Sequence, residues 1–126
     1  MTTVALVVLL VLLAALTVFQ FALASGAPLG RFAWGGQDRV LPARLRVGSL
    51  VSIVIYAVIA VVALERAQMI DLLPGTVIET VAMWLIATYF VLGIVMNGIS
   101  RSKPERYTMT PVVIVLAVVS IVLALS

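Results

Sequence analysis

Residues 3–24 read TVALVVLLVLLAALTVFQFALA, an apolar run without a single charged side chain. A helix rising 1.5 Å per residue needs about 20 such residues to cross the roughly 30 Å hydrocarbon core of a bilayer. We therefore expect residues 3–24 to form a transmembrane helix. Ala22-Leu23-Ala24 resembles a signal-peptide cleavage site. However, no Lys or Arg precedes the run, and the run is longer than a signal core.

Three further runs of the same kind follow, at residues 47–64, 77–96 and 107–125. The chain has 126 residues, of which 64% are hydrophobic and only 10% charged, and its mean hydropathy is +1.30. Soluble domains carry about 25% charged residues, and a domain this small buries only about two thirds of its surface. Lipid must therefore cover most of the chain. We predict an all-α fold, a four-transmembrane-helix bundle of up-down-up-down order.

The predicted bundle is one membrane domain, residues 1–126. It has a first loop at 25–46, a short outer turn at 65–76 and a third connection at 97–106. Glycine and proline residues mark these boundaries. Pro74-Gly75 is expected to turn the chain between the second and third helices, and Pro111 is expected in the first turn of the fourth helix.

The basic residues predict how the bundle is oriented. Seven of the eight lie in the first and third connections, which must share one side of the membrane, and Arg66 alone lies on the other side. The positive-inside rule then places both connections in the cytoplasm and both chain termini outside. The net charge of +3 reflects these loops, so we expect no nucleic-acid partner.

Several classes of chemistry are excluded by composition. The chain has no cysteine and no histidine, which removes thiol chemistry, Cys/His zinc sites and nucleophiles activated by histidine. It also lacks a phosphate-binding loop, catalytically spaced carboxylates and a metal-ligand cluster. We therefore predict no catalytic residues, no metal and no cofactor.

The first loop is the most distinctive polar segment. It is long for a connection in a small bundle, and its backbone N–H groups and arginines are suited to holding an anion such as a lipid phosphate. Gly35-Gly36 permits backbone conformations that other residues resist. The simpler interpretation is an interfacial segment anchored by Trp34. The candidate residues for anion or lipid-headgroup binding are Arg31, Trp34, Gly35, Gly36, Arg39, Arg44, Arg46, Arg101, Lys103 and Arg106.

Other polar residues have two interpretations each. Glu105 lies among basic residues of the third connection, where it either helps to build a polar site shared with the first loop or pairs with Arg44 or Arg46. Gln20 and Tyr56 lie within the spans and are expected to hydrogen-bond across helices.

Glu79 is the candidate intramembrane acid. A carboxylate inside a span often marks a proton or substrate path. Its position one turn into the third helix also fits a structural role at headgroup level beside Glu65 and Arg66, where an acid is favourable at a helix N-terminus.

Specific strings in the loops resemble a known group of proteins. They are Gly26-Ala-Pro-Leu-Gly30, Trp34-Gly-Gly36, Leu41-Pro-Ala-Arg-Leu-Arg46 and Ser102-Lys-Pro-Glu-Arg106, together with Pro111. The chain is similar along its whole length to an uncharacterised family of small bacterial four-helix integral membrane proteins. This resemblance implies a multi-pass protein of the bacterial cytoplasmic (inner) membrane, and it implies no activity or site residue.

Three functions remain open. The first is a non-enzymatic, lipid-binding or accessory subunit with a polar cytoplasmic cap, whose partners are membrane lipids and a second copy or another membrane protein. The second is a small dimeric transporter using Glu79. Small multidrug exporters have this layout, but they carry a glutamate in the middle of the first helix, which this chain lacks. The third is a membrane enzyme acting on lipid through the polar residues Asp38, Asn97, Glu105, Arg106 and Tyr107.

Overall fold

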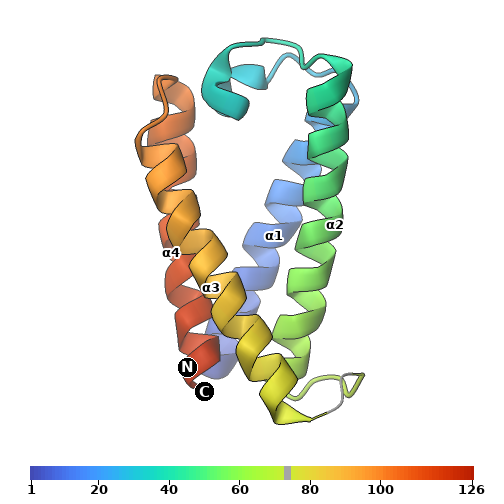
Figure 1. Ribbon diagram of the computed structural model, residues 1–126, viewed down its shortest axis with the longest axis vertical. Helices are drawn as coiled ribbons and strands as arrows, with labels where there is room; N and C mark the ends of the chain where they lie inside the picture. Colours follow the sequence, from blue (N-terminus) through green and yellow to red (C-terminus); the bar gives the residue numbers. More distant parts are fainter. Residues whose placement is uncertain (73–74) are drawn as a thin grey trace.

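The computed structural model describes residues 1–72 and 75–126, and within them the chain is helical with no strand (Figure 1). Two single-turn helices, η1 (Gly30–Phe32) and η2 (Trp34–Gly36), lie in the first loop. The four long helices are α1 (Thr2–Ala24), α2 (Ala43–Arg66), α3 (Thr76–Gly98) and α4 (Lys103–Leu125). The predicted all-α bundle is confirmed.

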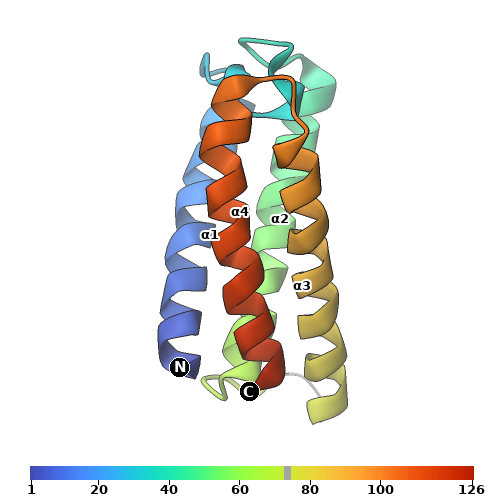
Figure 2. The same ribbon diagram turned by 90° about the vertical axis from the view of Figure 1, so that its left-hand side faces the viewer.

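The four helices alternate in direction, so the two termini lie at one end and loops one and three lie at the other (Figures 1 and 2). At the terminal end, the Thr2 and Ser126 hydroxyls are 2.9 Å apart and hydrogen-bonded. Helix α1 packs along α2, and α3 packs along α4. These two hairpins are close at the terminal end and diverge towards loop one (Figure 1).

Large apolar side chains are distributed over both the inside and the outside of the bundle. The main core contains Leu9, Met83 and Leu116, all of which are fully buried. Valines and leucines on the outer faces of all four helices are more than half exposed, such as Val54 and Leu85. A contiguous apolar surface of this extent is stable only against lipid. Because each helix is also long and apolar enough to cross a bilayer, the chain is a multi-pass membrane protein.

Helix α4 begins earlier than the apolar run does, and this corrects one prediction. Ser102 is the N-cap residue, and its hydroxyl accepts a hydrogen bond from the backbone N–H of Glu105. Ser102 and Glu105 have the spacing of a capping box, and Pro104 fits the first turn. Pro111 therefore lies inside α4, two turns beyond the start, and the prediction of Pro111 in the first turn was wrong.

The turn between α2 and α3 can be compared with expectation only in part. Gly75 is the N-cap of α3 and has a φ of +80°, a conformation that favours glycine. Pro74, the other half of the predicted turn, lies outside the described residues.

Candidate functional site

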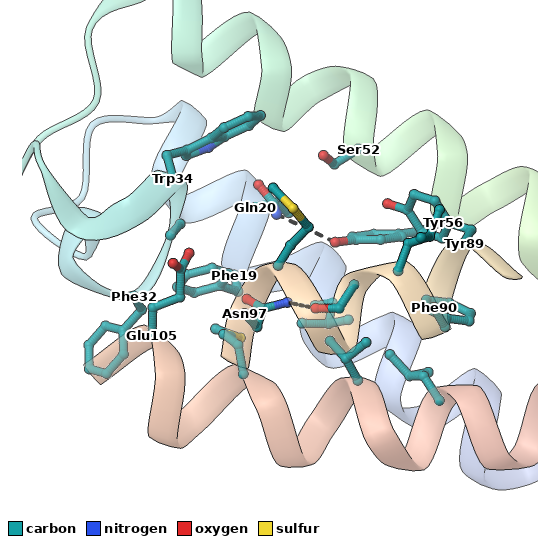
Figure 3. Close-up of a pocket in the computed structure, with 18 residues that line it drawn as sticks. Phe19, Gln20, Phe32, Trp34, Ser52, Tyr56, Tyr89, Phe90, Asn97 and Glu105 are labelled. Carbon is teal, nitrogen blue, oxygen red and sulfur yellow. Dashed lines mark hydrogen bonds between the residues drawn. The ribbon is translucent and has the colours of Figure 1, made fainter. Parts of the chain in front are cut away.

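A cavity of about 390 Å³ lies beneath loop one, where the two hairpins diverge (Figure 3). All four long helices contribute to its wall, and η1 and η2 contribute Phe32 and Trp34. Six of the nine aromatic residues of the chain line this inner cavity. They are Phe19, Phe32, Trp34, Tyr56, Tyr89 and Phe90.

A second cavity, of about 520 Å³, adjoins the first at the loop end of the bundle. The two share the lining residues Trp34, Met96, Asn97 and Glu105, so only these side chains lie between them. This outer cavity extends to Arg44, which is exposed. The space under loop one therefore has a polar outer end.

An apolar groove of about 270 Å³ continues in the opposite direction, between α2 and α3. It shares Tyr89 with the inner cavity, and its other lining residues are Val54, Ile55, Val58, Ile59, Leu85 and Ile86. Polarity thus decreases from the outer cavity, through the inner cavity, to the groove.

Loop one forms the roof of the inner cavity because it is folded back on itself. The backbone N–H of Gly30 donates to the carbonyl oxygen of Arg39 over 2.9 Å. Leu23, Ala33 and Leu41 form a small buried cluster that seats the loop on the end of α1. The loop is therefore an ordered part of the wall.

Trp34 is held in an unusual conformation. Its φ is +54°, which few non-glycine residues adopt, and its indole lies against α2 at Gly48. A Cβ atom at Gly48 would come within 2.8 Å of the indole ring. The predicted freedom of Gly35 and Gly36 is confirmed, since their φ angles are +77° and +72°.

Loops one and three are in contact. The Ser102 hydroxyl donates a hydrogen bond to the Arg31 carbonyl oxygen. The backbone of Gly36 lies so close to Ser102 that a Cβ atom on Gly36 would be 2.5 Å from the serine side chain. The two connections therefore build one cap, as the shared-site interpretation requires.

Glu105 is the charged residue of the inner cavity. Its side chain extends from α4 towards the space below Trp34 (Figure 3), and the residue is only 8% exposed. Its Oε1 atom accepts a hydrogen bond from the Ser100 hydroxyl. No ion pair joins Glu105 to Arg44 or Arg46, both of which the structure describes, so the alternative that Glu105 pairs with one of these arginines was wrong.

Polar side chains deeper in the cavity make hydrogen bonds, either to a neighbouring helix or to a carbonyl oxygen of their own helix. Gln20 Nε2 donates to the Tyr56 hydroxyl over 3.4 Å, which confirms that these residues hydrogen-bond across helices; that they bond to each other was not predicted. Ser52 donates to the Gly48 carbonyl, and Asn97 donates to the Gly93 carbonyl. Gln20 Oε1 is buried and has no hydrogen-bond partner among the described residues.

Few of the basic residues singled out from the sequence reach the cavities. Of the ten candidates, only Trp34, Gly35 and Arg44 line one. Arg46 instead donates from Nε to the Leu41 carbonyl over 2.8 Å, which holds the end of loop one. The guanidinium groups of Arg31 and Arg106 lie over the rings of their neighbours Phe32 and Tyr107, and Arg39, Arg101 and Lys103 are exposed.

Glu79 lies in the first turn of α3, at the other end of the bundle from the inner and outer cavities, where it lines a separate cavity of about 400 Å³. It is 7% exposed, and its Oε1 atom is 3.7 Å from Nη1 of Arg66. Arg66 also donates to Thr80 and to the carbonyl oxygens of Leu123 and Ala124 at the end of α4. This position beside Arg66 is the one that the structural interpretation of Glu79 expects.

Comparison with known protein families, with curated proteins and with solved structures finds no match to this chain. Sequence reasoning did not select Ser52 or Tyr89 as site residues, and it named Asn97 only for the membrane-enzyme alternative. Asn97 lies in the last turn of α3, whereas Ser52 and Tyr89 lie more than two turns inside α2 and α3, so the sequence carries no signal that singles them out.

Proposed function

We propose that this protein binds an amphipathic molecule of the membrane, with its polar group under loop one and its apolar part between α2 and α3. The observation that supports this most directly is that the outer cavity, the inner cavity and the α2–α3 groove adjoin one another, each sharing lining residues with the next. Ligand sites typically have volumes of about 300–1,000 Å³ and are mostly apolar with a few convergent polar groups.

The lining favours binding over catalysis. General acid–base chemistry requires an acid and a base at hydrogen-bonding distance from a reacting group. Among the described residues of the inner cavity, Glu105 is the only Asp, Glu, Lys or Arg. A single carboxylate without a neighbouring base or nucleophile is better suited to orienting a ligand than to transforming it.

Filling the cavity tests this function. Ser52 lines the inner cavity and donates to the carbonyl four residues earlier, whereas Thr88 makes the same type of bond on an exposed surface of α3. We expect Ser52→Phe to abolish retention of co-purified lipid in native mass spectrometry, because the ring occupies the ligand's space. Thr88→Phe, which loses an equivalent hydroxyl, should retain the lipid. Equal retention by both variants would contradict the proposal.

The orientation of the bundle is part of the same proposal. We propose that loops one and three face the cytoplasm of a bacterium, where the exposed side chains of Arg31, Arg39 and Arg101 lie near anionic headgroups of the inner membrane. The support is the clustering of basic residues at one end of the bundle, opposite the two termini (Figure 1).

A reporter fusion tests this orientation. An enzyme active only in the periplasm should be active when it is fused after Ser126 and silent when it is inserted between Arg101 and Lys103. A reporter active only in the cytoplasm should give the opposite pattern. Reversal of both patterns would show that the basic loops lie outside.

A further inference from the structure

The inner cavity has a net negative charge within an apolar wall. Glu105 is its one charged lining residue among those described, and no cation forms an ion pair with it there. Its Oε1 atom accepts a hydrogen bond from the Ser100 hydroxyl, and its Oε2 atom accepts none from the described residues. An ionised carboxylate in such surroundings gains most from a partner that brings positive charge and hydrogen-bond donors.

The aromatic rings around Glu105 point to the same class of partner. Six rings line the same cavity as Glu105, and two of them, Trp34 and Phe32, come from loop one (Figure 3). The face of an aromatic ring carries a negative partial charge, and organic ammonium groups bind well between such faces. A carboxylate among rings is therefore favourable for a cation and unfavourable for an anion.

The neutral polar groups also favour a ligand that donates hydrogen bonds. Ser52, Gln20 and Asn97 each donate one hydrogen to an oxygen of the protein. The buried acceptor Gln20 Oε1 has no partner in the described chain, and leaving such an atom unpaired is unfavourable. Gln20 lies between Trp34 and Tyr56, facing the cavity (Figure 3).

The arginines provide little opposing charge within the inner cavity. Arg46 is bonded to the Leu41 carbonyl, and Arg31 lies over the Phe32 ring. Arg44 reaches only the outer cavity and is exposed, where water and salt screen its charge. Glu105 is buried, so its field within the cavity is screened less.

We propose that the ligand is an amphipathic amine, whose ammonium group lies between Glu105 and Gln20 and whose hydrocarbon part extends towards the α2–α3 groove. This proposal rests on the proposed binding function and names its ligand class. The ligand is recognised by the charge of the carboxylate, by the ring faces and by the unpaired amide oxygen together.

Three probes of equal chain length test this class: n-octylamine, n-octanol and octanoate. At pH 7 the amine is protonated, as lysine is, the alcohol is neutral and the acid is ionised. Binding is followed by the fluorescence of Trp34 in a nonionic maltoside detergent, with the exposed Trp84 replaced by phenylalanine. The Ser52→Phe variant gives the background from partition into the micelle.

We expect the amine to bind at least about tenfold more tightly than octanol, and octanoate to bind no more than the background. Glu105→Gln should weaken amine binding about tenfold or more and change octanol binding less than about twofold. Gln20→Leu should weaken the amine by a smaller factor. Asp71→Asn, which removes one negative charge at the opposite, exposed end, should change none of these values.

The outcomes separate this inference from the binding function on which it rests. Tighter binding of octanoate, lost on Arg44→Ala, would overturn the amine class and assign an anion site. Equal binding of all three probes above background would also overturn it, while leaving the cavity a binding site. Binding of every probe at the background level would overturn the proposed function itself. Because the probe series uses the unmodified cavity, it decides these cases even if Glu105→Gln fails to fold.

Discussion

Replacement of Arg66 by alanine is expected to lower the free energy of unfolding by about 3–5 kcal/mol, the range measured when one partner of a buried ion pair is removed. The Arg66 side chain is only 13% exposed and connects three helices. It donates to the Leu123 and Ala124 carbonyl oxygens in the last turn of α4, where the regular intrahelical N–H donors are missing. Its loss also leaves Glu79 buried without its cation.

Thermal unfolding in maltoside detergent measures this effect. Arg101→Ala is the matched control, because Arg101 is an exposed arginine at the other end of the bundle, and it should leave the melting temperature unchanged. Arg66→Lys should be intermediate, since an ammonium group cannot bond several carbonyls with the geometry of a guanidinium. Adding Glu79→Gln to Arg66→Ala should recover part of the loss. A melting temperature for Arg66→Ala equal to that of the control would show that this contact is dispensable.

Replacement of Gly30 by alanine is expected to open loop one. A Cβ atom at Gly30 would lie 1.7 Å from the carbonyl oxygen of Asp38, far inside van der Waals contact, and this oxygen belongs to the backbone, so no side-chain rotation can relieve the clash. The two segments of loop one around Gly30 and Asp38 must therefore separate, which breaks the hydrogen bond from the Gly30 N–H to the Arg39 carbonyl oxygen. Phe32 and Trp34 then leave the roof of the cavity, and ligand retention should fall to the level of Ser52→Phe.

Limited trypsin digestion detects this opening, because Arg31 and Arg39 lie within the folded loop. We expect cleavage at these two sites to be about tenfold or more faster in Gly30→Ala, as ordered loops resist proteolysis until they open. Gly98→Ala is the control, since a Cβ atom there meets nothing within 4 Å. If Gly30→Ala and Gly98→Ala are cleaved at equal rates and retain ligand equally, the loop does not depend on the close approach at Gly30.

The four helices could be predicted because the bilayer sets their length. Hydrogen bonds from Gln20 and Tyr56 across helices could be predicted for a related reason, since a polar side chain inside a span needs a partner, but the sequence did not identify that partner. The start of α4 was predicted four residues late because it was taken from the start of the apolar run. The capping box of Ser102 and Glu105 is polar and lies before that run. Local hydrogen bonding extended the helix beyond its apolar part.

The candidate site was harder to predict. Counting charges selects Arg31, Arg46 and Arg106, but it cannot show that these side chains are engaged with neighbouring rings or carbonyl oxygens. Glu105 was not a candidate intramembrane acid, as Glu79 was, because it lies outside the apolar run. Its burial arises from the contact between the two loops and from the divergence of the hairpins, and both are properties of the tertiary arrangement.

The groove between α2 and α3 opens on the side of the bundle that faces hydrocarbon. A ligand that arrives through it comes from the leaflet, so the quantity that governs occupancy is its mole fraction among the lipids rather than its concentration in water. Two amphiphiles with the same intrinsic affinity will then differ in apparent affinity by the ratio of their partition coefficients. Dissociation will follow the same route, which returns the ligand to the leaflet.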